Sequence, residues 1–184
     1  MGTFTVSESS VWIFGYGSLI WRPNFKYLRS EQGHLSGWKR FFYQGSPDHR
    51  GTPECPGCVV TIVREPRAQC FGRLYLIEQA EYSRVFSYLD EREAEGYEKL
   101  LLLVETLNGE SIEAVVYVAS TQNPHFLDNW SILEIARRIR TAAGPSGSNL
   151  EYFWRLHDSL EASGVVDDHV MAIASELRKQ LPSG

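Results

Sequence analysis

The hydrophobic pattern changes its period part-way along the chain, and this change restricts the fold more than any other feature. Through the first two thirds, short runs of β-branched and aromatic residues recur between turn signals, which is typical of strands. We expect strands over residues 11–16, 36–43, 58–63 and 69–77. After residue 128 the period becomes helical and remains so to the end of the chain.

Two further runs predict a β-hairpin. Residues 97–106 and 111–118 read as strands, and Leu107-Asn108-Gly109-Glu110 lies between them. The Asn-Gly pair supplies the positive φ angles that a tight hairpin turn requires. We therefore expect these two strands to be antiparallel neighbours.

Four segments have helical signals. One helical pattern, residues 79–94, interrupts the strands, and three helices are expected after residue 128. Segments 131–134 and 148–151 both have the Ser-x-x-Glu spacing of a capping box, so helices should begin near residues 132 and 149. Residues 144–147, Gly-Pro-Ser-Gly, should end the first of these, and Asp167-Asp168 opens a last helix to about residue 180. The pattern predicts an α+β fold: a mixed, mainly antiparallel β-sheet or β-barrel with inserted and C-terminal helices.

Length and charge restrict the class of protein. A chain of 184 residues with 43% hydrophobic residues can bury one full core. We expect a single domain over residues 11–184, after an N-terminal extension of residues 1–10 that can be disordered. A net charge of −5 leaves no excess of lysine and arginine for phosphates, which argues against nucleic acid and anionic membranes as partners. No apolar run is long enough to cross a bilayer, and the first ten residues lack a secretory signal, so we expect a cytoplasmic protein of unspecified oligomeric state.

The first predicted strand runs directly into Gly15-Tyr16-Gly17-Ser18. This segment is neither a dinucleotide-binding GxGxxG motif nor a Walker loop, and Ser18 does not lie in a GxSxG elbow. In one interpretation the glycines let a ligand approach the backbone, whose successive N–H groups hold a carboxylate or a developing oxyanion. In the other interpretation they form a bulge or a tight turn that needs positive φ angles.

The helical segment 79–94 singles out one acidic residue. On a helical wheel, Glu93 continues the apolar stripe of Tyr82, Val85, Phe86 and Leu89, whereas the other acids of the segment and Arg92 lie off it. Burial raises the pKa of a carboxyl group, which suits a general base that works near neutral pH. The alternative is that the helix ends before residue 93, or that Glu93 pairs structurally with an arginine such as Arg50 or Arg73.

Residues 45–57 are the one long Gly- and Pro-rich stretch, and such a loop is either functional or mobile. It contains Cys55 and Cys58 in a CxxC motif, but no second pair completes a zinc site and the motif precedes a strand. A turn with incidental thiols is therefore favoured over a redox protein. The five histidines include no i, i+4 pair, so the sequence predicts no metal site.

Four segments, in this order, resemble the ChaC-like branch of the γ-glutamylcyclotransferase superfamily, which acts on glutathione. They are FGYGSLIW (14–21), QGSPDHRGTPECPGCVVTIV (44–63), YLDEREAEGY (88–97) and AAGPSGSNLEY (142–152). The resemblance implies a small mixed α/β domain built on a β-barrel, no cofactor, and conversion of glutathione into 5-oxoproline and cysteinylglycine. Glu91 and Glu95 add charges near the expected site, and the CPGC cysteines are not part of the family pattern.

The resemblance also implies roles for particular residues. The family's catalytic glutamate corresponds to Glu93, which would act as general base and then as general acid. The family's substrate loop, with its adjoining residue, corresponds to Ile13, Phe14, Gly15, Tyr16, Gly17, Ser18 and Leu19.

Three residues outside that loop are further candidates for the site. His49 and Arg50 could meet the glycine carboxylate of glutathione, although a salt bridge with Asp48 within the loop is an equal alternative. Tyr152 could line the pocket, or it could be an ordinary buried helix tyrosine. Two other functions stay open: a cyclotransferase with broader γ-glutamyl specificity, and a binding module that lacks catalysis.

Overall fold

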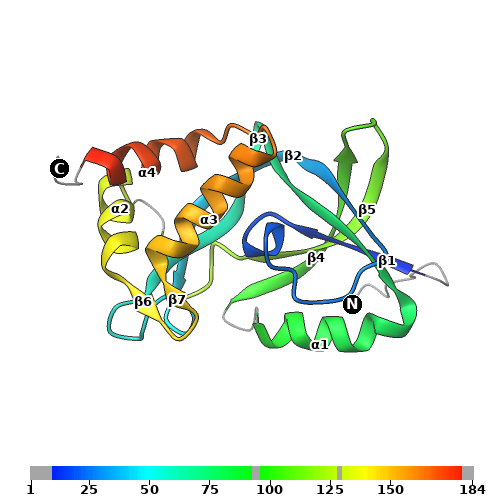
Figure 1. The fold of residues 1–184 in the computed structure, drawn as a ribbon, viewed down its shortest axis with the longest axis horizontal. Coiled ribbons are helices and arrows are strands. Elements are labelled where there is room, and N and C mark those ends of the chain that lie inside the picture. The colour runs from blue at the N-terminus through cyan, green and yellow to red at the C-terminus, as the bar shows by residue number, and fades with distance from the viewer. Residues whose placement is uncertain (1–9, 93–95, 128–129, 180–184) are drawn as a thin grey trace.

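A closed β-barrel forms the larger part of the molecule (Figure 1). The computed structural model describes residues 10–92, 96–127 and 130–179. The barrel has the strand order β1-β3-β2-β4-β5, and its neighbours are antiparallel except for β1 and β5, which are parallel. The strands are β1 (Ser10–Gly15), β2 (Arg29–Ser46), β3 (Gly57–Glu78), β4 (Tyr97–Thr106) and β5 (Ser111–Ala119). The expected mixed, mainly antiparallel α+β barrel is confirmed, and Ser10, assigned above to the N-terminal extension, is the first residue of β1.

The long β2–β3 hairpin corrects two boundaries. Residues 58–63 and 69–77 belong to one continuous strand, β3, and the strand expected over 36–43 extends in both directions as β2. The register moves from Ser36 opposite Gln69 to Trp38 opposite Arg64, so residues 65–68 form a bulge opposite one residue of β2. This bulge, Glu65-Pro66-Arg67-Ala68, lies in the gap between the two strands expected from the sequence.

The β4–β5 hairpin is as predicted. Its register runs from Tyr97 opposite Ala119 to Glu105 opposite Ser111. Gly109 in the connecting turn has a φ of 81°. This is the left-handed conformation expected of the glycine, whereas Asn108 does not have a positive φ, so the expectation for the pair holds at Gly109 alone.

The helices also lie where their signals placed them. They are α1 (Tyr82–Arg92), α2 (Ile132–Thr141), α3 (Asn149–Ala162) and α4 (Asp168–Lys179). Ser131 and Glu134 form a complete capping box. At α3, the Ser148 side chain accepts a hydrogen bond from the Glu151 N–H, but the Glu151 carboxylate bonds Arg50 and Arg155, so only half of the predicted box forms. Gly144-Pro145-Ser146-Gly147 is a short hairpin between strands β6 (Ala143–Gly144) and β7 (Gly147–Ser148).

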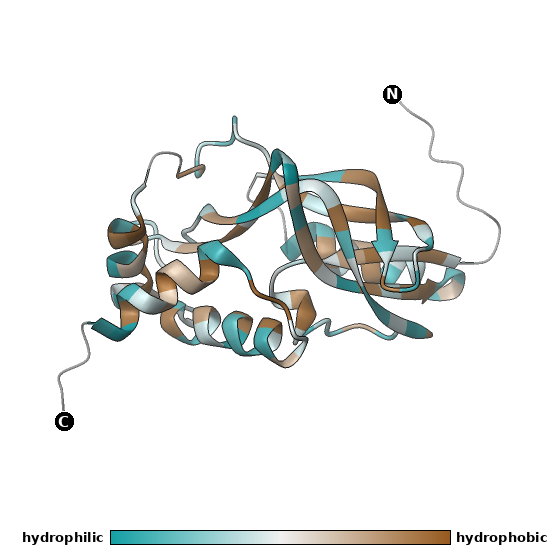
Figure 2. Cartoon of the chain, turned by 90° about the horizontal axis from the view of Figure 1, so that it is seen from above, coloured by the Kyte–Doolittle hydropathy of each residue, from teal (hydrophilic) through white to brown (hydrophobic). Residues whose placement is uncertain are grey.

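Two clusters of apolar side chains pack the helices against the barrel. The larger joins the barrel to α2, α3 and α4, which gather at one end of the molecule (Figure 1). The smaller packs Val85, Phe86 and Leu89 of α1 against β1, β3 and β5. Apolar and polar residues alternate along the barrel strands in Figure 2, as expected for strands with one buried face. No helix in the described part of the chain is long and apolar enough to span a membrane.

Candidate active site

The turn after β1 is closely packed. Gly15-Tyr16-Gly17-Ser18 leads into a short 3-10 helix, η1 (Ser18–Ile20). A Cβ atom on Gly15 would lie 2.4 Å from the Leu19 Cβ, and one on Gly17 would lie 2.9 Å from the Val60 Cγ2. Gly17 has a φ of −119°, so positive φ is not the reason for this glycine. The turn needs glycine because neighbouring atoms approach the backbone too closely for a side chain.

Two adjoining cavities lie beside this turn. The larger, of about 560 Å³, is lined by residues of η1, β2, the β2–β3 loop, α1, β4, the β6–β7 turn and α3. The smaller, of about 50 Å³, is lined mainly by the turn itself. The residues common to both linings are Ser18, Arg92, Tyr97 and Tyr152. The larger cavity is within the size range of ordinary small-molecule sites.

Most of the predicted site residues border these cavities. The smaller cavity is lined by Phe14, Gly15, Tyr16, Gly17, Ser18 and Leu19, and the larger by Ser18, Arg50 and Tyr152. Ile13 does not line either cavity, because its side chain points to the opposite face of β1, into the cluster under α1. Glu93 lies outside the described residues. Arg92, which directly precedes it, borders both cavities.

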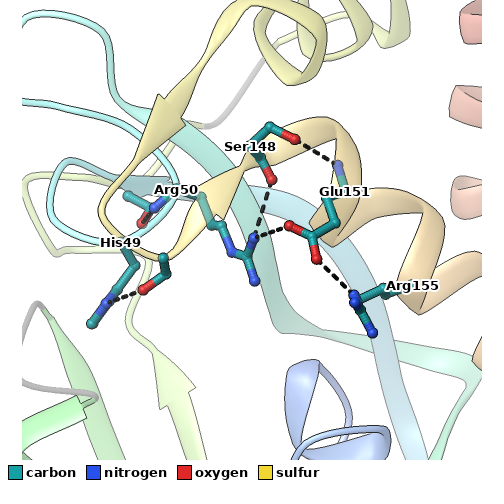
Figure 3. A network of polar contacts seen from close by, with 7 residues as sticks. His49, Arg50, Ser148, Glu151 and Arg155 are labelled. Carbon is teal, nitrogen blue, oxygen red and sulfur yellow. Dashed lines mark hydrogen bonds and ion pairs between the residues drawn. The ribbon is translucent and has the colours of Figure 1, made fainter.

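Arg50 is a buried cation in the wall of the larger cavity (Figure 3). Its Nη1 donates to the Ser148 carbonyl at 3.2 Å and lies 3.4 Å from a Glu151 carboxylate oxygen. Burial lowers the pKa of the guanidinium, which Glu151 partly offsets. The alternative of a loop salt bridge with Asp48 holds for His49, whose Nε2 lies 3.3 Å from an Asp48 carboxylate oxygen, and not for Arg50, whose carboxylate partner is Glu151.

His49 joins three segments at the edge of the larger cavity. Its Nε2 lies 3.3 Å from the Arg92 carbonyl oxygen, and its Nδ1 lies 3.3 Å from the Ser146 Oγ. A carbonyl oxygen only accepts hydrogen bonds, so Nε2 carries the proton. His49 thereby links the β2–β3 loop to the C-terminal end of α1 and to the β6–β7 turn.

Tyr152 connects α3 to the turn after β1. Its hydroxyl accepts a hydrogen bond from the Val60 N–H at 3.4 Å and would lie 3.3 Å from a Cβ on Gly17. Its ring packs edge-on against Trp21, with 5.5 Å between ring centroids, and the Arg50 guanidinium lies 5.5 Å from the ring centroid. Tyr152 is therefore both a buried helix tyrosine and a cavity wall, so the two interpretations of this residue do not exclude each other.

Sequence reasoning missed Arg92. Its Nη2 donates to the Ser18 Oγ and its Nη1 to the Tyr88 hydroxyl at 3.3 Å, so it ties the end of α1 to the turn after β1. On the helical wheel Arg92 lies off the apolar stripe and looks like a solvated charge. A helical wheel shows which residues share one face of a helix, but it contains no information about what lies beyond the end of that helix.

The charged groups in the wall of the larger cavity favour an anionic ligand. Among the described residues they are three arginines, Arg22, Arg50 and Arg92, against two carboxylates, Asp48 and Glu91. Arg22 and Arg50 lie close enough for each to oppose the charge of the other. An anion between them would relieve this repulsion.

The groups that suggest thiol or metal chemistry lie outside both cavities. Cys55 and Cys58 are free thiols, and burial raises the pKa of Cys58 to about 12, so this thiol is not a reactive thiolate at neutral pH. Within the described residues, the group with metal-ligand spacing is His157, Asp158 and Glu161 on α3. Its two acids are exposed and an Arg178 nitrogen lies 3.4 Å from the His157 Nε2, which disfavours a cation.

Comparison with known proteins identifies the relatives of this chain. The family model described as ChaC-like protein matches residues 11–180. The chain is 39% identical over 176 residues to a zebrafish (Danio rerio) protein named glutathione-specific γ-glutamylcyclotransferase 1, covering 92% of this chain and 90% of that protein. It is 38% identical to γ-glutamylcyclotransferase 2-3 of Arabidopsis thaliana, covering 92% and 89% respectively. The crystal structure of a yeast γ-glutamylcyclotransferase specific to glutathione superposes with a TM-score of 0.87 at 26% identity, covering 94% of this chain and 97% of the yeast chain.

Proposed function

Because the chain belongs to the ChaC-like protein family, we propose that it converts glutathione into 5-oxoproline and cysteinylglycine. The observation that carries this proposal is the near full-length similarity to proteins named as glutathione-specific γ-glutamylcyclotransferases, in sequence and in structure. The cationic cavity of about 560 Å³ supports it, since glutathione is a small peptide with two carboxylates and one ammonium group.

The proposed reaction is a ring closure within the substrate. The α-amino nitrogen of the γ-glutamyl unit attacks its own γ-carbonyl carbon, one C–N bond forms, and the C–N bond to the cysteine nitrogen breaks. The α-ammonium nitrogen loses two protons as it becomes the lactam N–H, one before the attack and one from the tetrahedral intermediate. The cysteine nitrogen gains two as it becomes the ammonium group of cysteinylglycine, so the reaction consumes no water and releases no net proton. Nucleophile and electrophile share one molecule, so most of the catalytic task is to hold the γ-glutamyl unit folded.

We assign the proton transfers to Glu93. As a carboxylate it would take the proton from the α-ammonium group, and as the resulting acid it would give one to the cysteine nitrogen. Two observations support this role: on a helical wheel of the sequence Glu93 continues the apolar stripe of segment 79–94, and the preceding residue, Arg92, borders both cavities.

Two parts of the site would hold the ends of glutathione. Backbone N–H groups of the turn from Gly15 to Leu19 would bind the α-carboxylate or the oxyanion of the tetrahedral intermediate. Arg50 would bind the glycine carboxylate. Its contacts with Ser148 and Glu151 both use Nη1, so the Nε and Nη2 donors remain for a ligand.

The proposal is tested by product analysis of the purified protein with glutathione. Mass spectrometry should detect 5-oxoproline and cysteinylglycine in equal amounts, and wild-type protein without these products would refute the proposed function.

Glu93→Gln should lose turnover by about 100-fold or more while glutathione still binds, because an amide cannot accept the proton. Glu98→Gln, the same change at an exposed residue of β4, is the matched control. Equal turnover in Glu93→Gln and wild type would reject the assignment of the base.

A broader specificity is the second candidate, because the name of the Arabidopsis relative does not restrict the substrate to glutathione. Glutathione and γ-glutamyl-alanine should therefore be compared at equal concentration. We expect faster turnover of glutathione, since γ-glutamyl-alanine places its carboxylate one residue closer to the reacting carbonyl and further from Arg50. Equal rates would favour the broader enzyme.

A further inference from the structure

Arg40 of β2 is a charged side chain in the centre of the core. It is 1% exposed and borders neither cavity. Its Nε donates to the Tyr16 carbonyl at 2.8 Å, its Nη1 to the Asp167 carboxylate at 2.6 Å, and its Nη2 to the Phe71 carbonyl. Burying a guanidinium is costly unless its N–H groups are paired, and here all three nitrogens are used. The Nε contact with Tyr16 attaches Arg40 to the turn that borders the smaller cavity.

The contact with Tyr16 fixes the direction of one backbone donor. The Tyr16 carbonyl and the Gly17 N–H belong to the same peptide group, and no described peptide bond is cis. In a planar trans peptide the carbonyl and the N–H point in opposite directions. Arg40 draws the carbonyl into the core, so the Gly17 N–H points away from Arg40. Gly17 borders the smaller cavity and packs between Val60 and Tyr152, which border it as well.

Tyr16 is held at a second point. Its hydroxyl donates to the Tyr117 carbonyl at 2.7 Å, so side chain and carbonyl are anchored on different strands. If the Tyr16–Gly17 peptide flipped, the Arg40 Nε would lose its acceptor inside the core, which is costly for a charged donor. The flipped peptide would also turn a carbonyl dipole towards a bound anion. Both effects favour the orientation that presents the N–H.

We propose that Arg40 is a positioning residue that holds the Gly17 N–H as a preorganised donor to the anionic group of the substrate at the turn. The proposal rests on the proposed function for the identity of that substrate. Asp167, directly before α4, neutralises Arg40, so the C-terminal part of the chain takes part in shaping this turn. No catalytic step passes through Arg40 itself.

Arg40→Lys and Asp167→Asn form a matched pair of variants. Lysine keeps the charge but has one nitrogen for three acceptors, whereas Asp167→Asn leaves the Arg40 Nε free to bond Tyr16. We expect kcat/KM for glutathione to fall about tenfold or more in Arg40→Lys relative to Asp167→Asn, when both are measured well below their melting temperatures. Equal losses in the two variants, or an Arg40→Lys variant with wild-type kcat/KM, would overturn the proposal.

A second measurement does not depend on activity. Tyr16-Gly17 is the only Tyr-Gly pair in the sequence, so protein labelled with ¹³C-carbonyl tyrosine and ¹⁵N-glycine gives a single amide signal for this peptide. In substrate-free protein this signal should shift or broaden in Arg40→Lys and stay in place in Asp167→Asn. An unchanged signal in folded Arg40→Lys would refute the positioning role. Absence of glutathione turnover in wild type would refute the proposed function and leave this readout intact.

Discussion

At the scale of single residues, Gly17 separates two explanations of one motif. The sequence suggested that its missing side chain leaves room for a ligand. In the structure, the space a Cβ would occupy is bounded by the Val60 Cγ2 at 2.9 Å and the Tyr152 hydroxyl at 3.3 Å. Packing therefore demands glycine here even before a ligand is considered.

This contrast leads to a rescue experiment. Gly17→Ala should reduce glutathione turnover and lower stability by about 1–3 kcal/mol, because the new methyl group overpacks the turn. Val60→Ala removes the Cγ2 atom that would clash with the new methyl group. The double variant Gly17→Ala/Val60→Ala should therefore recover part of the lost turnover. Turnover is compared with Val60→Ala alone, which carries the cost of the core truncation. A double variant as inactive as Gly17→Ala would show that the ligand needs the space.

At the scale of elements, the loop between β2 and β3 is held in place by its neighbours. The Ser146 N–H donates to the His49 carbonyl at 2.9 Å, and the Arg50 N–H donates to the Ser46 Oγ at 3.1 Å. These bonds attach the loop to the β6–β7 turn and to the end of β2. The loop thereby presents Arg50 to the cavity from a fixed position.

The role proposed for Arg50 predicts a substrate-dependent effect. Arg50→Ala should raise KM for glutathione about tenfold, the loss expected for one charge-assisted hydrogen bond. KM for γ-glutamylcysteine should change much less, because this dipeptide lacks the glycine carboxylate. Arg155→Ala is the matched control, since Arg155 bonds the same Glu151 at 2.8 Å but does not line the cavity. Equal changes in KM for both substrates would contradict the role.

At the scale of the whole molecule, the C-terminal helices complete a site that begins in the barrel. Tyr152 and Glu151, the partner of Arg50, come from α3. Asp167, directly before α4, binds Arg40, and His169 of α4 binds β2. His169 is 7% exposed, and its Nε2 accepts a hydrogen bond from the Phe42 N–H at 3.0 Å. This bond requires the neutral imidazole, so the attachment of α4 to the barrel depends on pH.

Stability should therefore fall on mild acidification. Burial lowers the pKa of His169 from 6.5 to about 4, an effect that Asp167 partly opposes. Between these two pH values the unfolded chain binds more protons than the folded one, so the stabilisation present above pH 6.5 is lost as the pH falls towards 4. Urea unfolding at pH 7.5 and pH 5 should show a decrease of about 2 kcal/mol from this group, because pH 5 lies 1.5 units below the unfolded pKa of 6.5 and each unit is worth about 1.36 kcal/mol. His169→Gln, which keeps an acceptor without titrating, should reduce the pH dependence, and an unchanged slope would contradict this origin.

The local sequence determined the helices and strands of this protein, and it indicated most of the residues that border the cavities beside the turn after β1. The two hydrophobic periods, the Asn108-Gly109 turn and the Ser131 capping box each act over a few residues, so strands, hairpin and helix starts could be predicted from them. The continuity of β3 could not, because a bulge and a turn share the same polar residues and only pairing with β2 distinguishes them.

Contacts between distant segments were decided by the tertiary structure alone. Arg92 meets Ser18 across 74 residues, and Arg40 meets Asp167 across 127. Glu151 looked like the second half of a capping box, but Arg50 and Arg155 take its carboxylate. In each case the choice of partner depends on which groups the closed barrel and its helices bring within about 3 Å, and the energy of a buried charge depends on that distance far more than on sequence spacing.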